Sequence, residues 1–371
     1  MLPVVWIFGA SGVGKSTAGF RVLQGLAAAG VVAALVDADQ LRLARGVSAS
    51  ETQLIASGLP RLEREFGAHD ARVLIVTGIA DDAAHLSSLL AGLPRHRVFT
   101  VHLDVEAPAL RERIRRRGSL LDEMEENVEY AARLDPSLAG LRIDTTGRAV
   151  AEIASRITAE VMSFLEAAAS DSSDVPRTNE GAGSVGLPRE AVLISGPGGV
   201  GLSTIGYSTY SRMAATGRPA AYLDAYQLGF LGAEPRSEEL APMRAANVTA
   251  IADILTRAGA HTIVVTGDAR TIRSVSDAWR GAPLTAIWLH ASPEALAERI
   301  TQRARGAGPG IPGDHRAGLD GPALAEAIAT AVGERTRYDD MPDGTAVVDT
   351  SALTAAQAAE GIVARLGNAA D

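Results

Sequence analysis

Four residues near the start of the chain have types and a spacing suited to holding phosphate. Gly9, Gly14, Lys15 and Ser16 fit the pattern G-x-x-x-x-G-K-[ST] within the stretch GASGVGKST. In this pattern the glycines let the backbone curve around an anion, the lysine places a point charge beside the β and γ phosphates, and the hydroxyl binds Mg²⁺. The alternative is a chance glycine turn. Lys15 is the only lysine among 371 residues, which favours the functional interpretation.

The residues on either side of this loop predict the elements that must position it. The apolar stretch VVWIF (4–8) reads as a strand, and TAGFRVLQGLAAAG (17–30) has the period of a helix. Strand, loop and helix in this order are the context that the motif requires, so we expect ATP and Mg²⁺ as cofactors. The expected nucleotide contacts are Gly9, Ser11, Gly12, Val13, Gly14, Lys15, Ser16 and Thr17, with Ser16 also at the metal.

The same order of segments occurs twice along the chain. The first loop pairs with GPGGVGLST (196–204), VDADQLR (36–42) with LDAYQLG (223–229), and RVLIVTG (72–78) with HTIVVTG (261–267). We therefore expect two tandem α/β domains, at 1–168 and 190–371, joined by a Ser-, Gly- and Pro-rich linker at 169–189. In each domain, alternating strands and helices predict a parallel sheet with helices on both faces, and each half is long enough that it could bury a core of its own. The alternative is one large doubly wound domain with chance likeness between its halves.

Composition excludes several classes of protein. The net charge of −9 and the 4% of aromatic residues argue against a nucleic-acid surface. No apolar run reaches the roughly 18 residues of a membrane helix, and the apolar start leads directly into the loop. The absence of cysteine excludes disulfides and thiol chemistry. We expect a cytoplasmic protein that binds neither nucleic acid nor membrane.

The motif VDADQLR, taken with the loop, resembles the small P-loop kinases: shikimate kinase, gluconate kinase, adenylylsulfate kinase and chloramphenicol phosphotransferase. The resemblance implies a P-loop NTPase fold of the nucleoside-monophosphate-kinase type. It also implies that Asp37 approaches Mg²⁺ through water, that Asp39 orients or deprotonates the acceptor hydroxyl, and that Arg42 holds an anionic part of the acceptor. Alternate residues of a strand share a face, so both carboxylates can point into one site. The alternative role for Asp39 is a helix cap.

Two further segments of the first half are similar to parts of these kinases. LRERIRRRG (110–118) resembles the helix that leads into a mobile lid, which makes Arg113 and Arg117 candidate catalytic residues, four apart on one helix face. The alternative is a solvated arginine face paired with the acidic stretch DEMEENVE (122–129). VTG (76–78) resembles the segment that holds the acceptor in shikimate kinase, so Gly78 is a candidate for substrate binding, although a plain strand end fits equally.

The second copy departs from the pattern at two positions. Leu202 stands where the first loop has Lys15, and Tyr226 stands where the first copy has Asp39. Without the lysine and the carboxylate we expect a degenerate copy that binds nucleotide weakly, contributes to the acceptor site, or braces the first copy. A different catalytic site using Asp224, Asp268 and nearby arginines is the remaining alternative.

The function that these patterns predict is a Mg²⁺- and ATP-dependent kinase for a small-molecule acceptor, with its chemistry in the first half and contacts between the two halves. The identity of the acceptor is not encoded in any motif. The competing hypotheses are a regulatory nucleotide-binding protein and a scaffold without turnover.

Overall fold

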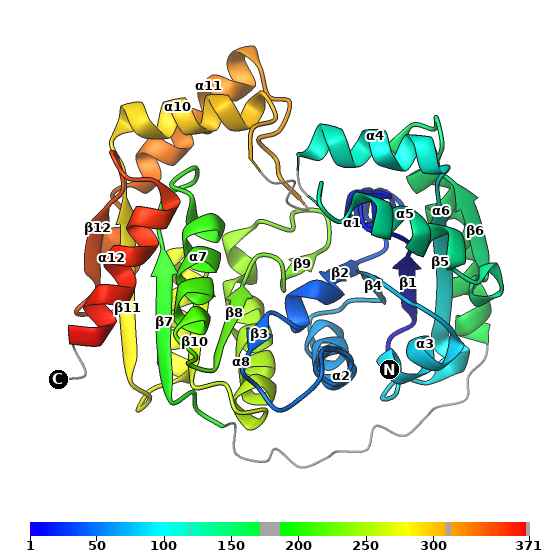
Figure 1. Cartoon of the computed structure of the whole chain (residues 1–371), viewed down its shortest axis with the longest axis horizontal. Helices are drawn as coiled ribbons and strands as arrows, with labels where there is room; N and C mark the ends of the chain where they lie inside the picture. Colours follow the sequence, from blue (N-terminus) through cyan, green and yellow to red (C-terminus); the bar gives the residue numbers. More distant parts are fainter. Residues whose placement is uncertain (119, 171–185, 309–312, 369–371) are drawn as a thin grey trace.

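The computed structural model of the chain describes residues 1–118, 120–170, 186–308 and 313–368. Two six-stranded sheets stand side by side, and helices cover their faces (Figure 1). The α/β class with two mostly parallel sheets is thus confirmed. The expected linker at 169–189 lies largely outside the described residues; the last helix of the first half ends at Ser170 and the next strand begins at Glu190.

The first sheet takes five parallel strands from the first half. In spatial order these are β6 (Leu141–Asp144), β5 (Val98–Asp104), β1 (Val4–Phe8), β4 (Val73–Gly78) and β2 (Ala33–Asp37). Its helices are α1 (Lys15–Ala28), α2 (Glu51–Ala68), α3 (Ala83–Leu89), α4 (Ala107–Arg117), α5 (Met124–Arg133) and α6 (Val150–Ser170), and a 3₁₀ turn η1 (Ala38–Leu41) follows β2. The central strands β1 and β4 are buried along their whole length, as a sheet covered on both faces requires.

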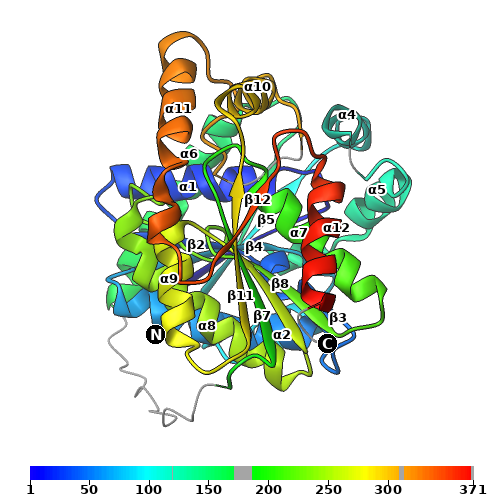
Figure 2. The same cartoon turned by 90° about the vertical axis from the view of Figure 1, so that its left-hand side faces the viewer.

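The second sheet has the same spatial order of corresponding strands. It lies toward the viewer in Figure 2. It contains β12 (Ala346–Asp349), β11 (Leu284–His290), β7 (Glu190–Ser195), β10 (Thr262–Thr266) and β8 (Ala220–Asp224). Its helices are α7 (Leu202–Ala215), α8 (Ala241–Arg257), α9 (Ala269–Ala278), α10 (Pro293–Ala304), α11 (Gly321–Glu334) and α12 (Ala355–Asn368).

Each sheet is completed by a two-residue strand from the other half. The sixth strand of the first sheet is β9 (Phe230–Leu231), which runs antiparallel to β2, and the sixth strand of the second sheet is β3 (Ala44–Arg45), antiparallel to β8. The expectation of purely parallel sheets confined to each half is therefore wrong at both edges. A physical reason is that β2 and β8 would otherwise be open edges with unpaired backbone groups.

One of the three buried hydrophobic clusters is shared by the two halves, whereas the other two lie almost entirely within the first half and within the second half. Alternate residues of β1 point to opposite faces: Val5 and Ile7 pack under α1 and α6, whereas Trp6 and Phe8 belong to a buried cluster that continues into the second half. Helices α2 and α8 lie between the sheets and pack against each other (Figure 1). A Cβ on Gly58 of α2 would lie 3.2 Å from Ile251 Cδ1 of α8, so the two helices approach closely there.

No helix within the described residues is long and apolar enough to cross a membrane.

Candidate active site

The first loop leaves β1 at the carboxyl edge of its sheet and ends in α1. Gly14 precedes the helix with a φ of 104°, in the left-handed region that favours glycine. A Cβ on Gly9 would collide with the carbonyl oxygen of Leu103, so this position also requires glycine. The helix begins at Lys15, two residues before the expected stretch, because the end of the loop forms its first turn. Its free N–H groups and dipole point at the space that the loop encloses.

Lys15 lies across its own loop. Its Nζ donates hydrogen bonds to the carbonyl oxygens of Gly9 at 2.9 Å and Ala10 at 3.0 Å. Burial lowers the pKa of Lys15, while the negative charges of Asp37 and Asp39 oppose that shift. The structure thus brings the lysine and both carboxylates into one electrostatic group.

Two of the predicted residues form a direct pair at the foot of this loop. Ser16 Oγ donates a hydrogen bond of 2.6 Å to Asp37 Oδ2, which joins the start of α1 to the end of β2. Burial and the nearby charge of Asp39 raise the pKa of Asp37, with the hydrogen bond from Ser16 acting in the opposite direction. A buried carboxylate beside a hydroxyl is a suitable environment for a divalent cation, which would offset the cost of the charge.

Mg²⁺ would take most of its remaining ligands from nucleotide and water. Within the described parts of the chain there is no group of three or more His, Cys, Asp or Glu side chains that could hold a metal ion. Mg²⁺ in phosphoryl-transfer sites commonly uses one or two protein ligands together with substrate phosphates, so Ser16 and Asp37 fit that role.

Asp39 and Arg42 lie at the more open side of the same site, on and directly after η1. The Asp39 side chain is 53% exposed and forms an ion pair with Arg42 at 2.7 Å; Arg42 also pairs with Glu51 at the start of α2. Asp37 Oδ1 accepts a hydrogen bond from the Asp39 backbone N–H. The cap of this turn is therefore Asp37, which leaves the Asp39 carboxylate outside the turn and accessible to an acceptor.

Arg113, a candidate lid residue, contacts the phosphate loop itself. Its guanidinium donates to the carbonyl oxygen of Val13 at 2.9 Å, to Thr145 Oγ1 at 2.9 Å and to the Thr145 carbonyl oxygen at 2.7 Å. These contacts tie the outer side of the loop to the end of β6. In this arrangement Arg113 positions the loop.

Replacing Arg113 with glutamine should loosen the loop. We expect the free energy of unfolding to fall by about 1.5 to 3 kcal/mol, the usual range for a hydrogen bond to a charged group, and nucleotide affinity to fall with it. Arg299 is the matched control, because it makes the same contacts with Val200 and Thr350 in the second half. Thermal unfolding should show a similar loss of stability for Arg299→Gln and Arg113→Gln, whereas turnover should decrease only for Arg113→Gln. Equal turnover of the two variants would contradict this role.

Among the other arginines of α4, some fit the predicted lid and others fit the alternative of a solvated arginine face. Arg117 is exposed at the end of the helix, and its positive charge contributes to lowering the pKa of Lys15, so it acts on the loop. Arg111 forms an ion pair with Glu125 of α5 at 2.6 Å, and Arg116 pairs with Glu112. Those two belong to the solvated face that the acidic stretch suggested.

The remaining predicted residues differ in their burial. Gly78 is buried at the end of β4, and a Cβ there would lie 3.0 Å from the Trp6 ring and 3.1 Å from Ala38. Gly12 packs against Ile114 of α4, Val13 is buried, Ser11 is half-buried and Thr17 is exposed. Sequence reasoning missed Glu51, which pairs with Arg42 and has no spacing signal of its own.

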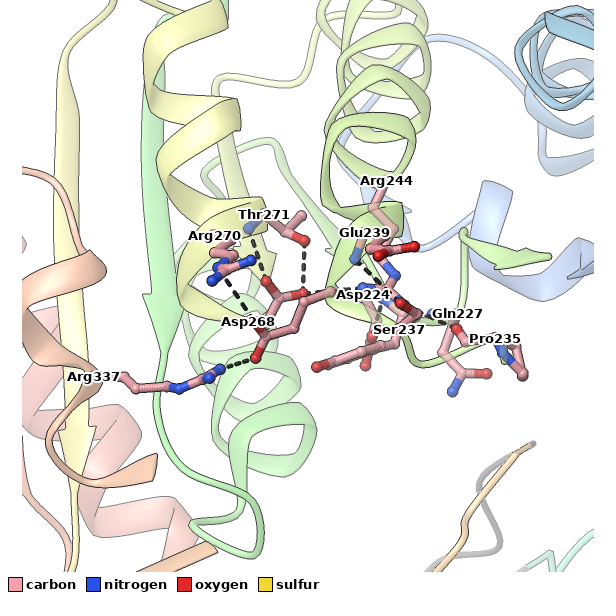
Figure 3. A network of polar contacts seen from close by, with 12 residues as sticks. Asp224, Gln227, Pro235, Ser237, Glu239, Arg244, Asp268, Arg270, Thr271 and Arg337 are labelled. Atoms are coloured by element: carbon pink, nitrogen blue, oxygen red, sulfur yellow. Dashed lines mark hydrogen bonds and ion pairs between the residues drawn. The ribbon is translucent and has the colours of Figure 1, made fainter. Parts of the chain in front are cut away.

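The second loop repeats part of this geometry. Ser203 Oγ donates to Asp224 Oδ2 at 2.7 Å, matching the Ser16–Asp37 pair. The carboxylate of Asp39 has no counterpart: the ring of Tyr226 lies beneath two guanidinium groups, with Arg244 Cζ 4.6 Å and Arg236 Cζ 5.2 Å from its centroid. Figure 3 shows the surrounding network, in which Arg244 donates to Asp268. A cavity of about 760 Å³ opens over this second loop.

No protein-family model and no curated protein sequence matches the chain. Among solved structures, it is similar to a gluconokinase from Sinorhizobium meliloti (19% identity, 46% of this chain and 98% of that chain, TM-score 0.32). It is also similar to a shikimate kinase from Acinetobacter baumannii (18% identity, 44% of this chain and 94% of that chain, TM-score 0.30). A third similar structure is the APS kinase of Mycobacterium tuberculosis, solved with AMPPNP and APS (24% identity, 44% of this chain and 98% of that chain, TM-score 0.31). These matched structures are small P-loop kinases, the group that the sequence motifs resemble.

Proposed function

We propose that the chain is an ATP- and Mg²⁺-dependent phosphotransferase that acts on a small-molecule acceptor, with its chemistry in the first half. The observation that carries this proposal is the gathering of Lys15, the Ser16–Asp37 pair and the exposed Asp39 at one edge of the first sheet. Phosphoryl transfer requires mainly positioning, neutralisation of charge and a carboxylate near the attacking oxygen. This site offers each of them.

Each residue has a distinct task in this proposal. ATP would supply the transferred phosphoryl group, and Mg²⁺ would neutralise its charge. The loop N–H groups and Lys15 bind phosphate, while Ser16 and Asp37 hold the cation. Asp39 accepts the proton of the acceptor hydroxyl, Arg42 orients an anionic part of the acceptor, and Arg117 adds positive charge on the open side. Gly78 lies beneath the acceptor.

The division into an active domain (1–168) and a degenerate one (190–371) by duplication belongs to the same proposal. Its support is the equal strand order of the two sheets together with the loss of Lys15 and Asp39 counterparts in the second. The degenerate second loop favours a second candidate function, a nucleotide-binding regulator whose halves shift against each other. A screen of candidate acceptors distinguishes the two functions. A phosphotransferase should turn over ATP many-fold faster with one acceptor, whereas a regulator would hydrolyse ATP at a rate that no acceptor changes.

Exchanging Asp39 for asparagine should separate binding from chemistry. The change keeps the size of the side chain and leaves the loop intact, so nucleotide affinity should stay within about twofold, whereas kcat for the acceptor should fall by about 100-fold or more, within the range for general base catalysis. Arg42→Gln serves as the comparison, because it removes the ion-pair partner of Asp39 but keeps the carboxylate. It should raise KM for an anionic acceptor more than it lowers kcat. A loss of ATP affinity with normal residual kcat in Asp39→Asn would make Asp39 structural.

A further inference from the structure

The cavity of the second half is built differently from the first site. Its lining residues come from the second loop, the carboxyl end of β8, the segment after β10, and the helices α10 and α11. Figures 1 and 2 show where these elements lie. Its volume of about 760 Å³ is within the range of small-molecule sites. The residues proposed for chemistry in the first half do not line it, so its occupant requires a separate explanation.

Side chains of the protein already occupy the second loop. The carboxylate of Glu334, at the end of α11, accepts a hydrogen bond of 2.7 Å from the backbone N–H of Gly198. The guanidinium of Arg316 lies over the same glycine, where a Cβ would collide with it. An internal carboxylate on a loop amide shows that the loop still favours an anion, but it also leaves less room there for a nucleotide phosphate.

In the part of the chain that the structure describes, Arg236 and Arg316 face this cavity without a carboxylate partner, as does Arg299, whose guanidinium already donates to Val200 and Thr350. Arg303 forms an ion pair with Asp314 at 2.5 Å, and Arg337 pairs with Glu238. Among the described residues, in contrast, no ion pair involves Arg236 or Arg316. The Nε of Arg316 is buried and has no hydrogen-bond partner there, an arrangement that calls for a missing acceptor.

The positive charges act on one another inside the cavity. Burial lowers the pKa of Arg236, and the charge of Arg316 adds to that shift although Tyr226, Asp224 and Asp314 oppose it. Partial burial and the charges of Arg236 and Arg316 together lower the pKa of His315 to about 4. A bound anion would relieve this repulsion.

The backbone holds Arg236 ready for such an anion. Its Nε and Nη2 donate to the carbonyl oxygen of Gly313 at 3.0 Å and 2.7 Å, next to His315 and Arg316. This contact fixes the segment that carries Arg316 against the segment that follows β9. Both guanidinium groups therefore line the same cavity from two different parts of the chain.

We propose that this cavity binds a phosphorylated small molecule, with the phosphate between Arg236 and Arg316, and that the second half is a ligand-binding site without phosphoryl transfer. A phosphate carries nearly two negative charges and three acceptor oxygens, which suits two arginine forks better than a single carboxylate does. Leu202 and Tyr226 remove the lysine and carboxylate that transfer would need. The site lies outside the proposed active site and does not depend on it.

Calorimetric titration of the full chain with inorganic phosphate and pyrophosphate tests this site. The parent protein should carry Lys15→Ala, so that the first loop contributes little. We expect binding to persist in this parent and to weaken about tenfold or more with Arg316→Gln, and likewise with Arg236→Gln, because each loses a charge-assisted contact. Arg280→Gln is the matched control, since Arg280 is 83% exposed and lies outside the cavity. Its phosphate affinity should not change.

Glu334→Gln supplies a change with the opposite sign. It removes a negative charge beside the loop while keeping an acceptor for Gly198, so phosphate should bind more tightly. Arg236→Gln could fail to fold because it releases the carbonyl oxygen of Gly313. In that case the test rests on Arg316 alone: phosphate affinity should fall in Arg316→Gln and be partly restored in Arg316→Lys. Phosphate affinity that is unchanged in Arg316→Gln, or lost entirely in the Lys15→Ala parent, overturns the proposal. So does tighter arginine-dependent binding of malonate than of phosphate or pyrophosphate, which would indicate a carboxylate ligand.

Discussion

Replacing Lys15 with alanine is expected to lower phosphoryl transfer by about 100-fold to 1000-fold, the usual cost of losing one preorganised contact to developing charge. The ammonium group lies over the loop, bonded to the carbonyl oxygens of Gly9 and Ala10, and shares the site with Asp37 and Asp39. Lys15→Arg should also be slow, because a planar guanidinium is wider than the ammonium that the loop encloses. Steady-state turnover with an identified acceptor measures both effects.

Leu202→Ala is the matched control, because Leu202 has the equivalent position in the second loop. It should leave turnover nearly unchanged. The single lysine also allows a direct measurement: an amine-selective reagent should label Lys15 and, apart from it, the N-terminal amine. ATP with Mg²⁺ should protect Lys15 and leave labelling of the terminus unaltered. A Lys15→Ala variant that keeps more than a third of wild-type turnover would refute this placement of the active site.

The elements with a strong local pattern could be predicted from the sequence. VVWIF is β1, the loop motif precedes α1, and VDADQLR spans the end of β2 and the turn that carries Asp39. In each case the signal is local: an apolar run, glycines at fixed offsets, or acidic residues after a strand. Ser16 and Asp37 were each expected near Mg²⁺ from their motifs, but the hydrogen bond between the first turn of α1 and the end of β2 had no signal of its own.

Other features depend on contacts between distant residues and had no local signal. The strands β3 and β9 contain two residues each, too few for a periodic pattern, and their partners lie in the other half. The spacing of Arg113 predicted a lid residue, but its hydrogen bonds to the carbonyl oxygens of Val13 and Thr145 had no local signal. The contact of Glu334 with Gly198 joins residues 136 positions apart.

The reciprocal strands also link the two sites mechanically. The segment that carries Asp39 and Arg42 continues directly into β3, which pairs with β8; the end of β8 is Asp224, beside Tyr226 and the second cavity. By the corresponding route, the chain runs from Tyr226 into β9, which pairs with β2, and β2 ends at Asp37. Each site is therefore one short segment away from a strand of the other half.

A first half expressed alone, as residues 1–170, should not fold into a stable monomer. It would lack β9 at the edge of its sheet and would expose the face of α2 that packs against α8. Leu59 and Leu62 of α2 are fully buried in the shared cluster, and each such side chain loses about 1.5 to 3 kcal/mol of stabilisation when exposed. Losses of this size, added together, approach the entire stability of a typical domain, about 5 to 15 kcal/mol.

Cleavage of the folded full chain provides the control for this experiment. A protease site introduced within 169–189 should yield two fragments that stay together on gel filtration and keep their turnover, because the shared cluster and the exchanged strands connect residues on both sides of the cut. Expression of the first half alone and cleavage of the folded full chain thus produce nearly the same first-half polypeptide. We expect the fragment expressed alone to be unstable and the cleaved chain to stay associated and active. A monomeric fragment 1–170 that binds ATP with the affinity of the full chain would show that the first half is an independent unit, and that the second half contributes to function without being needed for folding.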